Sequence, residues 1–256
     1  SSGCAKLTKD LPSQKKLRNI DFVIVNGENA DESGVGLTKK ICEKFFSSGV
    51  DVITTGNHVC DQKEIMNFIE NEKRLLIPKN YFETSIVRGF EIFTTSNNFK
   101  IGVLNLMGNV FMKKSNDGFE AANQVINKFK LKKDFDFLVV DFHGEITSEK
   151  NAIGHFFDGK ASLVVGTHTH IPTNDARILQ NGTAYQTDAG MCGDYDSVIG
   201  MNKNNSLNRF MKKDSVKHFP ANGDSTLCGV IVECNIETGL ANRVESYIFG
   251  EQLKNS

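Results

Sequence analysis

Apolar residues fall in short runs that alternate with amphipathic stretches along most of the chain. The runs at 21–26, 51–55, 136–142 and 161–166 have the length and continuous apolar character of strands buried on both faces of a sheet. Between them, helical periodicity predicts helices at 5–17, 38–48, 119–130 and 148–157. This alternation predicts an α/β layered fold.

The ends of two helices carry recognisable signals. Thr38 can cap the helix that runs to residue 48, where Gly49 ends it. Asp61 is followed three residues later by Glu64, and this pair resembles a capping box that opens a further helix at 61.

The middle of the chain contains a strand pair, and its last third is richer in strands. A strand pair at 90–95 and 100–106 surrounds an Asn-Asn turn, and after about residue 176 the helical pattern thins. Short strands are expected at 182–187, 227–235 and 242–249, which suggests a second sheet with antiparallel pairs. We expect one domain over 1–256.

Polar segments follow the predicted strands at four places: NGEN at 26–29, GNH at 56–58, DFHGE at 141–145 and GTHTH at 166–170. Loops at the carboxyl ends of strands in an open α/β sheet converge on one crevice. The side chains expected to meet there are those of Glu28, Asn29, Asn57, His58, His143, His168 and His170.

Imidazole, carboxylate and amide ligands suit iron, manganese or zinc, and no cysteine lies in these segments to indicate a structural zinc site. His168 and His170 are two residues apart, so in an extended segment both rings would face the same side. The neighbouring glycines permit tight turns and close backbone approach.

Each signal has an ordinary structural interpretation when taken alone. Glu28 can cap a helix or form a salt bridge, His143 can be a hydrogen-bonded core histidine, and a single His-x-His is often incidental. The joint pattern favours a metal centre, because four of the six histidines follow predicted strands beside Asn or Glu. His155 lies in a predicted helix and His218 in a polar loop, so neither is expected to act in catalysis.

Charge and composition limit the class of partner. The formal net charge is −1 and the lysines are scattered in pairs, so the sequence gives no strong signal for binding long nucleic acids. A small phosphorylated substrate remains compatible, because metal ions can supply positive charge. The six cysteines form no Cys-x-x-Cys pair, and neither a secretory signal nor an apolar run long enough for a membrane is present, so we expect reduced thiols and a cytoplasmic protein.

These segments, in this order, resemble the calcineurin-like metallophosphoesterase superfamily, which carries Gly-Asn-His and a late Gly-His-x-His. The closer resemblance is to the bacterial YmdB-like cyclic-nucleotide phosphodiesterases, through NGEN at 26–29 and DFHGEITSEK at 141–150. VVGTHTH at 164–170, NLMGNVFM at 105–112 and DYDSVIGM at 194–201 extend it over nearly the whole chain. The resemblance implies a four-layer α-β-β-α sandwich and an enzyme that hydrolyses small cyclic nucleotides, 2′,3′-, 3′,5′- or both.

The resemblance also implies a role for each site residue. Glu28 would bridge two divalent metal ions, with iron as the first expectation and manganese or zinc as alternatives. Asn29 and His170 would bind the first metal, whereas Asn57, His143 and His168 would bind the second. A hydroxide shared by the metals would attack phosphorus, and His58 would protonate the leaving oxygen. The family further suggests a homo-oligomer.

The sequence departs from the family pattern at its start. The family opens with a strand that ends in Gly-Asp-x-x-Gly, whose Asp is a ligand of the first metal. Neither the strand nor the Asp is in this sequence, so we expect that the chain as given starts late. Cys60 and the stretch 192–194 also differ from the family, which affects the expected pocket shape.

Four hypotheses remain open at this point. The first is the cyclic-nucleotide phosphodiesterase, and the second keeps the dimetal site but acts on a phosphomonoester or a nucleic acid end. The third is a regulatory or scaffold protein with a degenerate metal site, which the absent Asp motivates. The fourth is an amidohydrolase, which the late position of His168 and His170 disfavours, because such enzymes place this motif after their first strand.

Overall fold

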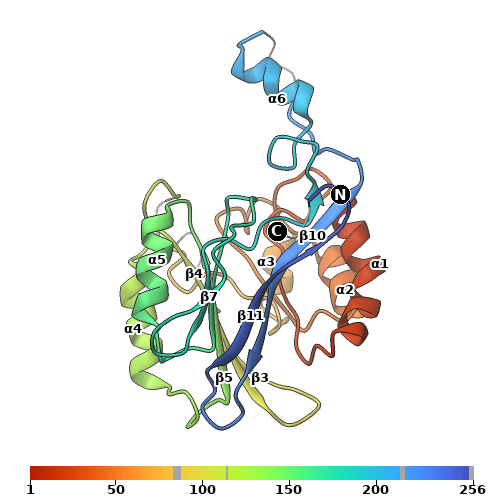
Figure 1. The fold of residues 1–256 in the computed structure, drawn as a ribbon. Helices are drawn as coiled ribbons and strands as arrows, with labels where there is room; N and C mark the ends of the chain where they lie inside the picture. Colours follow the sequence, from red (N-terminus) through yellow and green to blue (C-terminus); the bar gives the residue numbers. More distant parts are fainter. Residues whose placement is uncertain (83–87, 114, 214–216, 254–256) are drawn as a thin grey trace.

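A six-stranded sheet lies at the centre of the computed structural model, which describes residues 1–82, 88–113, 115–213 and 217–253 (Figure 1). Its strands, in spatial order, are β3 (Phe90–Thr94), β4 (Lys100–Met107), β5 (Phe137–His143), β6 (Leu163–Thr167), β8 (Ala184–Gln186) and β7 (Arg177–Ile178). The four inner strands are parallel, whereas β3 and β7 pair antiparallel at the edges. The carboxyl ends of β5 and β6 therefore lie side by side.

A second β layer packs on one face of this sheet. It contains the parallel pair β1 (Ile24–Asn26) and β2 (Val52–Thr54) and the antiparallel strands β9 (Gly193–Asp194), β10 (Ser225–Cys234) and β11 (Ala241–Phe249). Ile24 and Val52 pack against Ile101 and Val103 of β4. β10 and β11 thus form the antiparallel second sheet that the sequence predicts, whereas β8, within the strand expected at 182–187, instead joins the six-stranded sheet parallel to β6.

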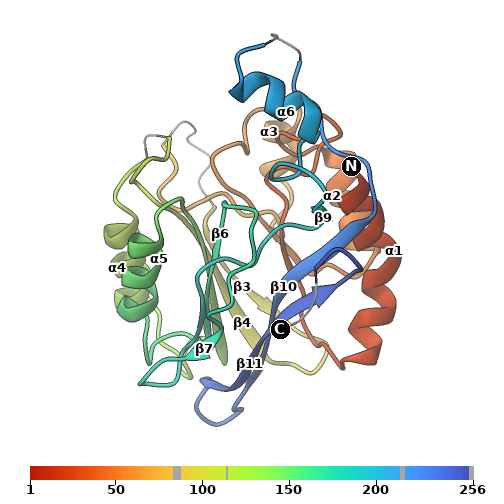
Figure 2. The same ribbon diagram turned by 45° about the horizontal axis from the view of Figure 1, so that its top comes forward.

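Helices cover both outer faces, which gives the order α-β-β-α (Figures 1 and 2). α4 (Gly118–Lys128) and α5 (Thr147–Phe156) lie on the six-stranded sheet, whereas α1 (Ser2–Leu17), α2 (Lys39–Ser47) and α3 (Ile65–Ile69) lie on the second layer. Successive side chains of a strand point to opposite faces, so Leu104 and Leu106 meet α4 and α5 while Ile101 and Val103 meet the second layer. The predicted four-layer α/β sandwich is confirmed.

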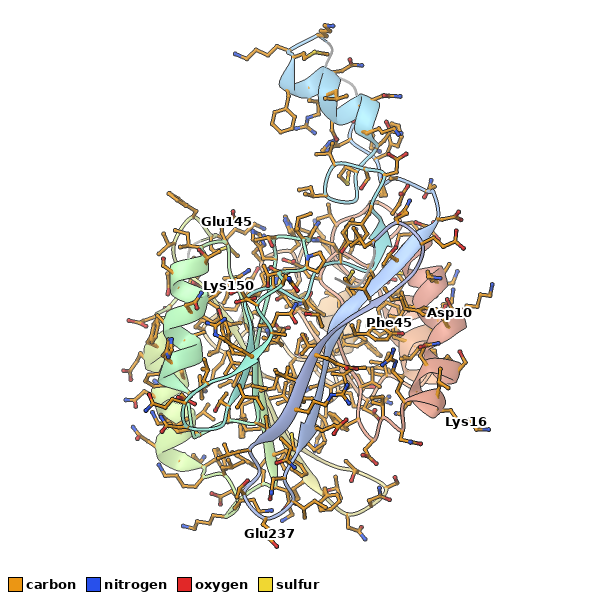
Figure 3. The ribbon with its side chains drawn as sticks, in the orientation of Figure 1. Asp10, Lys16, Phe45, Glu145, Lys150 and Glu237 are labelled. Atoms are coloured by element: carbon orange, nitrogen blue, oxygen red, sulfur yellow. The ribbon has the colours of Figure 1, made fainter. Side chains whose placement is uncertain are left out.

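The side chains follow this layering. Figure 3 shows Phe45 of α2 on the inner side of its helix, where it is 2% exposed, whereas the exposed Lys16 lies at the surface near the end of α1. Across the described ranges, no helix combines the length and the apolar character needed to cross a membrane.

Two sequence expectations about helices are wrong. α3 begins at Ile65 rather than Asp61, and no side chain caps it; the Asp61 carboxylate instead contacts His58. α6 (Lys203–Phe210) lies in a region where only strands and loops were expected. Its sequence is mostly polar, with an apolar stripe of only three residues, and its start is fixed by the Asn202 side chain, which accepts a hydrogen bond from the Asn205 N–H.

Candidate metal centre

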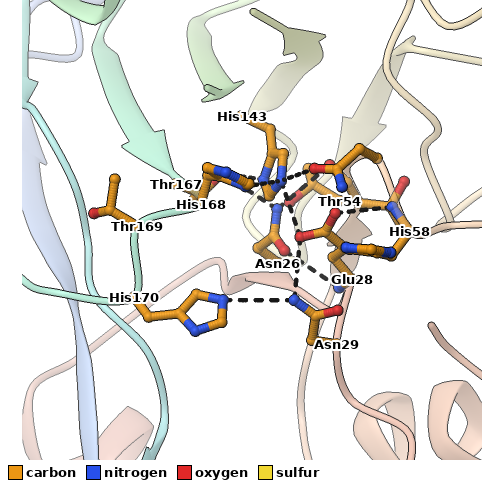
Figure 4. Close-up of polar contacts among 12 residues, drawn as sticks. Asn26, Glu28, Asn29, Thr54, His58, His143, Thr167, His168, Thr169 and His170 are labelled. Atoms are coloured by element: carbon orange, nitrogen blue, oxygen red, sulfur yellow. Dashed lines mark hydrogen bonds and ion pairs between the residues drawn. The ribbon is translucent and has the colours of Figure 1, made fainter. Parts of the chain in front are cut away.

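The four polar segments meet at the carboxyl ends of β1, β2, β5 and β6 (Figure 4). Glu28 and Asn29 follow β1, and Asn57 and His58 follow β2. His143 is the last residue of β5, whereas His168 and His170 follow β6. Every candidate residue predicted from the sequence is therefore near this place, although the residues divide into two groups and one outlying histidine.

The inner group surrounds the His143 ring. Its Nε2 lies 2.9 Å from Glu28 Oε2, 3.1 Å from Asn57 Oδ1 and 3.1 Å from His168 Nδ1. Glu28, Asn57 and His143 are almost fully buried, and the ligand atoms of Glu28, His143 and His168 all lie within 4.8 Å of one another. These distances place four potential metal ligands around one point.

Neighbouring hydrogen bonds fix which ring nitrogens carry protons. Thr167 donates its hydroxyl to Asp141 (2.7 Å) and therefore accepts from His143 Nδ1 (3.0 Å). His168 Nε2 lies 3.1 Å from Glu145, which accepts its proton. His143 Nε2 and His168 Nδ1 then face each other as lone pairs, together with the oxygens of Glu28 and Asn57. With the His143 ring neutral, these four atoms are acceptors that one cation would satisfy.

Without a bound cation, Glu28 and His143 stabilise each other as a charged pair. Burial alone would raise the pKa of Glu28, but the facing His143 outweighs burial and the pKa falls to about 2. Burial lowers the pKa of His143, yet Glu28 reverses this and the pKa is raised. Burial, with His143 adding to it, lowers the pKa of His168 to about 4. A carboxylate and a neutral imidazole are thus available at neutral pH.

Asn29 and His170 form the second group. His170 donates Nδ1–H to the Ile199 carbonyl at 2.7 Å, so its Nε2 lone pair accepts from the Asn29 Nδ2–H, 3.5 Å away. Asn29 Oδ1 is buried and has no hydrogen-bond partner among the residues that the structure describes. A second cation would satisfy the buried Asn29 oxygen and could take the His170 lone pair in place of the weak amide contact.

His168 and His170 do not lie in an extended segment, so the expectation that both rings face one side is wrong. Their φ angles are 112° and 67°, in the left-handed region that non-glycine residues rarely adopt. The rings consequently diverge, one toward His143 and the other toward Asn29 (Figure 4). Strain of this kind persists only where surrounding contacts hold it, and it is common at functional sites.

Thr169 anchors this strained turn. Its N–H and hydroxyl donate to Asp188 Oδ2 at 3.0 and 2.8 Å, and the same oxygen accepts from Lys150 Nζ at 2.7 Å. Lys150 and Asp188 are both 1% exposed. A buried, fully paired ion pair therefore positions the two histidines.

His58 lies at the edge of the cluster. Its backbone N–H donates to Glu28 at 2.9 Å, while its ring Nδ1 lies 2.7 Å from Asp61 Oδ2. The His58 side chain is 33% exposed, so a substrate can reach it. Asp61 was missed as a functional residue because its position suggested a helix start; the spacing of three residues after His58 was the available signal.

A second missed residue is Asp141, which is buried between the two β layers. It accepts hydrogen bonds from Asn26 (3.0 Å) and Thr54 of the second layer and from Thr167 of β6. Burial raises its pKa despite these donors.

The expected close approach at the glycines is also observed, because a Cβ at Gly56 would lie 2.3 Å from the His143 ring.

Comparison with known proteins gives a consistent picture. The family model described as YmdB-like protein matches residues 1–247. The 2′,3′-cyclic-nucleotide 2′-phosphodiesterase of Bacillus subtilis is 39% identical over 98% of this chain and 94% of its own length. A putative phosphatase/phosphodiesterase of Mycoplasma pneumoniae is 37% identical over 94% of this chain and 86% of its own.

A solved structure agrees with these relatives. The crystal structure of a hypothetical protein from Thermus thermophilus has a TM-score of 0.88 and 33% identity, covering 98% of this chain and 95% of that one. The expected enzyme class, phosphoric diester hydrolase, is confirmed by the relatives' names. The chain belongs to the YmdB-like protein family.

Proposed function

We propose that this enzyme hydrolyses 2′,3′-cyclic nucleotides at a centre of two divalent metal ions held by Glu28, Asn29, Asn57, His143, His168 and His170. The observation that carries the proposal is the buried cluster of potential ligand atoms around His143 Nε2, together with the orphan oxygen of Asn29. The substrate class comes from the Bacillus subtilis relative. Hydrolysis of 3′,5′-cyclic nucleotides is a further expectation.

The protein's own residues provide substrate orientation and a proton. Divalent ions bound here would neutralise charge on the phosphate and acidify a water molecule. His58, on the exposed edge of the cluster, donates a proton to the ribose oxygen that leaves phosphorus. Asp61 holds the His58 ring through Nδ1, so that Nε2 is directed away from Asp61. The hydrogen bond that the His58 backbone N–H donates to Glu28 ties this proton donor to the metal cluster.

Iron is our first expectation for the metal, with manganese or zinc next. Mixed nitrogen and oxygen ligands suit all three ions, and no cysteine belongs to the cluster among the described residues. Metal analysis of the purified chain decides among them.

Two other hypotheses retain some support. A phosphomonoesterase would use the same centre, and the Mycoplasma pneumoniae relative carries both names. A regulatory protein with a degenerate site would bind metal poorly, whereas the cluster has the lone pairs and the low carboxylate pKa of a binding site.

The test is hydrolysis of 2′,3′-cyclic AMP, 3′,5′-cyclic AMP and a phosphomonoester by the full chain, with and without manganese or iron. Metal-dependent opening of the 2′,3′-cyclic phosphate is the expected result. Turnover of the monoester alone would support the phosphatase, and a folded chain that binds less than about one metal and has no turnover would support the regulatory hypothesis.

A further inference from the structure

Between β9 and β10 the chain forms an arm, which the structure describes over residues 195–213 and 217–221; it projects from the molecule and carries α6 at its outer part (Figures 1 and 2). The sequence 195–221 contains five basic residues and two acidic ones, in a chain with 30 basic and 31 acidic residues. The net charge of the whole chain therefore conceals a local positive region, and the remainder of the chain has an excess of acid.

The basic side chains of the arm are available to a ligand. Lys203 pairs with Asp196 at 2.5 Å, but Arg209, Lys212, Lys213 and Lys217 form no ion pair within the ranges that the structure describes. All four are exposed. Such a group of cations suits a polyanion.

An apolar surface accompanies these cations. Phe210 is 80% exposed, Leu207 and Met211 are each 51% exposed, and Phe219 is 45% exposed. An aromatic ring among unpaired cations is the combination on which single-stranded nucleic acids stack their bases and place their phosphates.

The base of the arm adjoins the metal centre. The Ile199 carbonyl accepts the hydrogen bond from His170 Nδ1, and Pro220 lies so close to Gly34 that a Cβ there would be 2.9 Å from its Cγ. Gly34 belongs to the loop that carries Glu28 and Asn29. A strand bound along the arm would thus have one end at the cluster, and the eight residues of α6 extend the surface by about 12 Å.

We propose that the arm binds single-stranded RNA whose 3′ end carries a 2′,3′-cyclic phosphate, and that this end is the phosphodiester opened at the metal centre. The inference rests on the proposed function. RNA cleaved by its own 2′-hydroxyl ends in this group, so an RNA end and a free nucleotide share the same reacting chemistry. Water adds its oxygen to phosphorus and gives up a proton to solvent, one ribose P–O bond breaks, and the leaving oxygen takes a proton from His58, which solvent then restores.

The test compares two substrates of the manganese-loaded full chain: 2′,3′-cyclic AMP and an RNA decamer ending in a 2′,3′-cyclic phosphate. We expect a lower KM for the decamer, by about tenfold or more, and a steep loss of this advantage with salt. The variant R209Q/K212Q/K213Q should remove most of the advantage and lower the log–log salt slope by about 2, since single strands release about 0.7 counterion per contact. Its kcat/KM for 2′,3′-cyclic AMP should be unchanged.

Two further variants separate this role from general effects. The control K9Q/K16Q/K40Q removes three exposed cations from α1 and α2 and should leave the decamer KM unchanged. Phe210→Ala should weaken binding of a fluorescein-labelled decamer about tenfold, measured by anisotropy without turnover.

Failure of the inference differs from failure of the proposed function. Normal turnover of 2′,3′-cyclic AMP with no decamer advantage would overturn RNA binding by the arm and leave the proposed function standing. An equal loss of the decamer advantage in both triple variants would do the same. Conversion of an oligomer to a monomer by Phe210→Ala, with decamer binding intact, would also overturn it and identify the arm as a subunit contact. Absence of turnover on both substrates would overturn the proposed function.

Discussion

Replacing Asp61 by Asn tests whether a side chain outside the metal cluster positions the proton donor. Asp61 Oδ2 lies 2.7 Å from His58 Nδ1, and the substitution keeps the shape while removing the charge. Asp61 is absent from the group of potential metal ligands around His143. The metal content of Asp61→Asn should therefore equal that of the wild type.

The size of the effect follows from the contact. A hydrogen bond to a charged group contributes about 1.5–3 kcal/mol when well shielded. The His58 and Asp61 side chains are 33% and 34% exposed, so solvent screening reduces this contribution. We take about 1–1.5 kcal/mol. This corresponds to a decrease in kcat of about tenfold, with KM unchanged.

The assay is steady-state hydrolysis of 2′,3′-cyclic AMP by Asp61→Asn, His58→Ala and the double variant. If Asp61 acts through His58, the substitution has no further effect once the ring is gone. An equal loss of kcat in both backgrounds would refute the positioning role, as would an unchanged kcat in the single variant. Lys113→Met is the control, because it breaks only the exposed Lys113–Asp61 contact of 3.4 Å and should change kcat little.

Four other outcomes are expected. His58→Ala should retain its metal, by elemental analysis, and lose kcat by about 10²–10⁴. His168→Ala should lower metal affinity, by competition with a chelating dye, because it removes one lone pair from the cluster. In metal-free protein the pKa of His168 is about 4. As pH falls, the His168 ring of the unfolded chain is protonated near its ordinary pKa of about 6.5, before that of the folded chain. Urea denaturation should therefore show wild type losing free energy of unfolding relative to His168→Gln as pH falls from about 6.5 to about 4. Lys150→Met should destabilise the fold by about 3–5 kcal/mol, because Asp188 is left buried and unpaired, and adding Asp188→Asn should recover part of this loss.

The layers of the fold could be predicted because they depend on local patterns. Continuous apolar runs at β5 and β6 indicate burial on both faces, and the structure places them in the parallel centre of the large sheet. The convergence of Glu28, Asn57 and His143 follows from the same topology, since each comes at the carboxyl end of a parallel strand.

Other features depend on contacts that no local pattern records. The divergence of His168 and His170 comes from left-handed backbone angles. Asp188 holds this turn through Thr169 and is itself paired with Lys150, and the three residues come from separate parts of the chain. α6 was not predicted because it is short and mostly polar, and the few apolar residues in it and at its C-cap, Leu207, Phe210 and Met211, face no core. Whole-chain charge likewise hides a local basic arm, because the average includes acidic residues elsewhere.

The candidate centre joins the two β layers. Glu28 and Asn57 come from the second layer, whereas His143 and His168 come from the six-stranded sheet, and their contacts cross between the two. Beneath them, Asp141 of β5 accepts from Asn26 and Thr54 across the same boundary. Polar groups buried between sheets must find partners, and here the partners are supplied by the opposite sheet. The network below the cluster therefore fixes the relative position of the layers, and with it the spacing of ligands that lie too far apart in sequence to position one another.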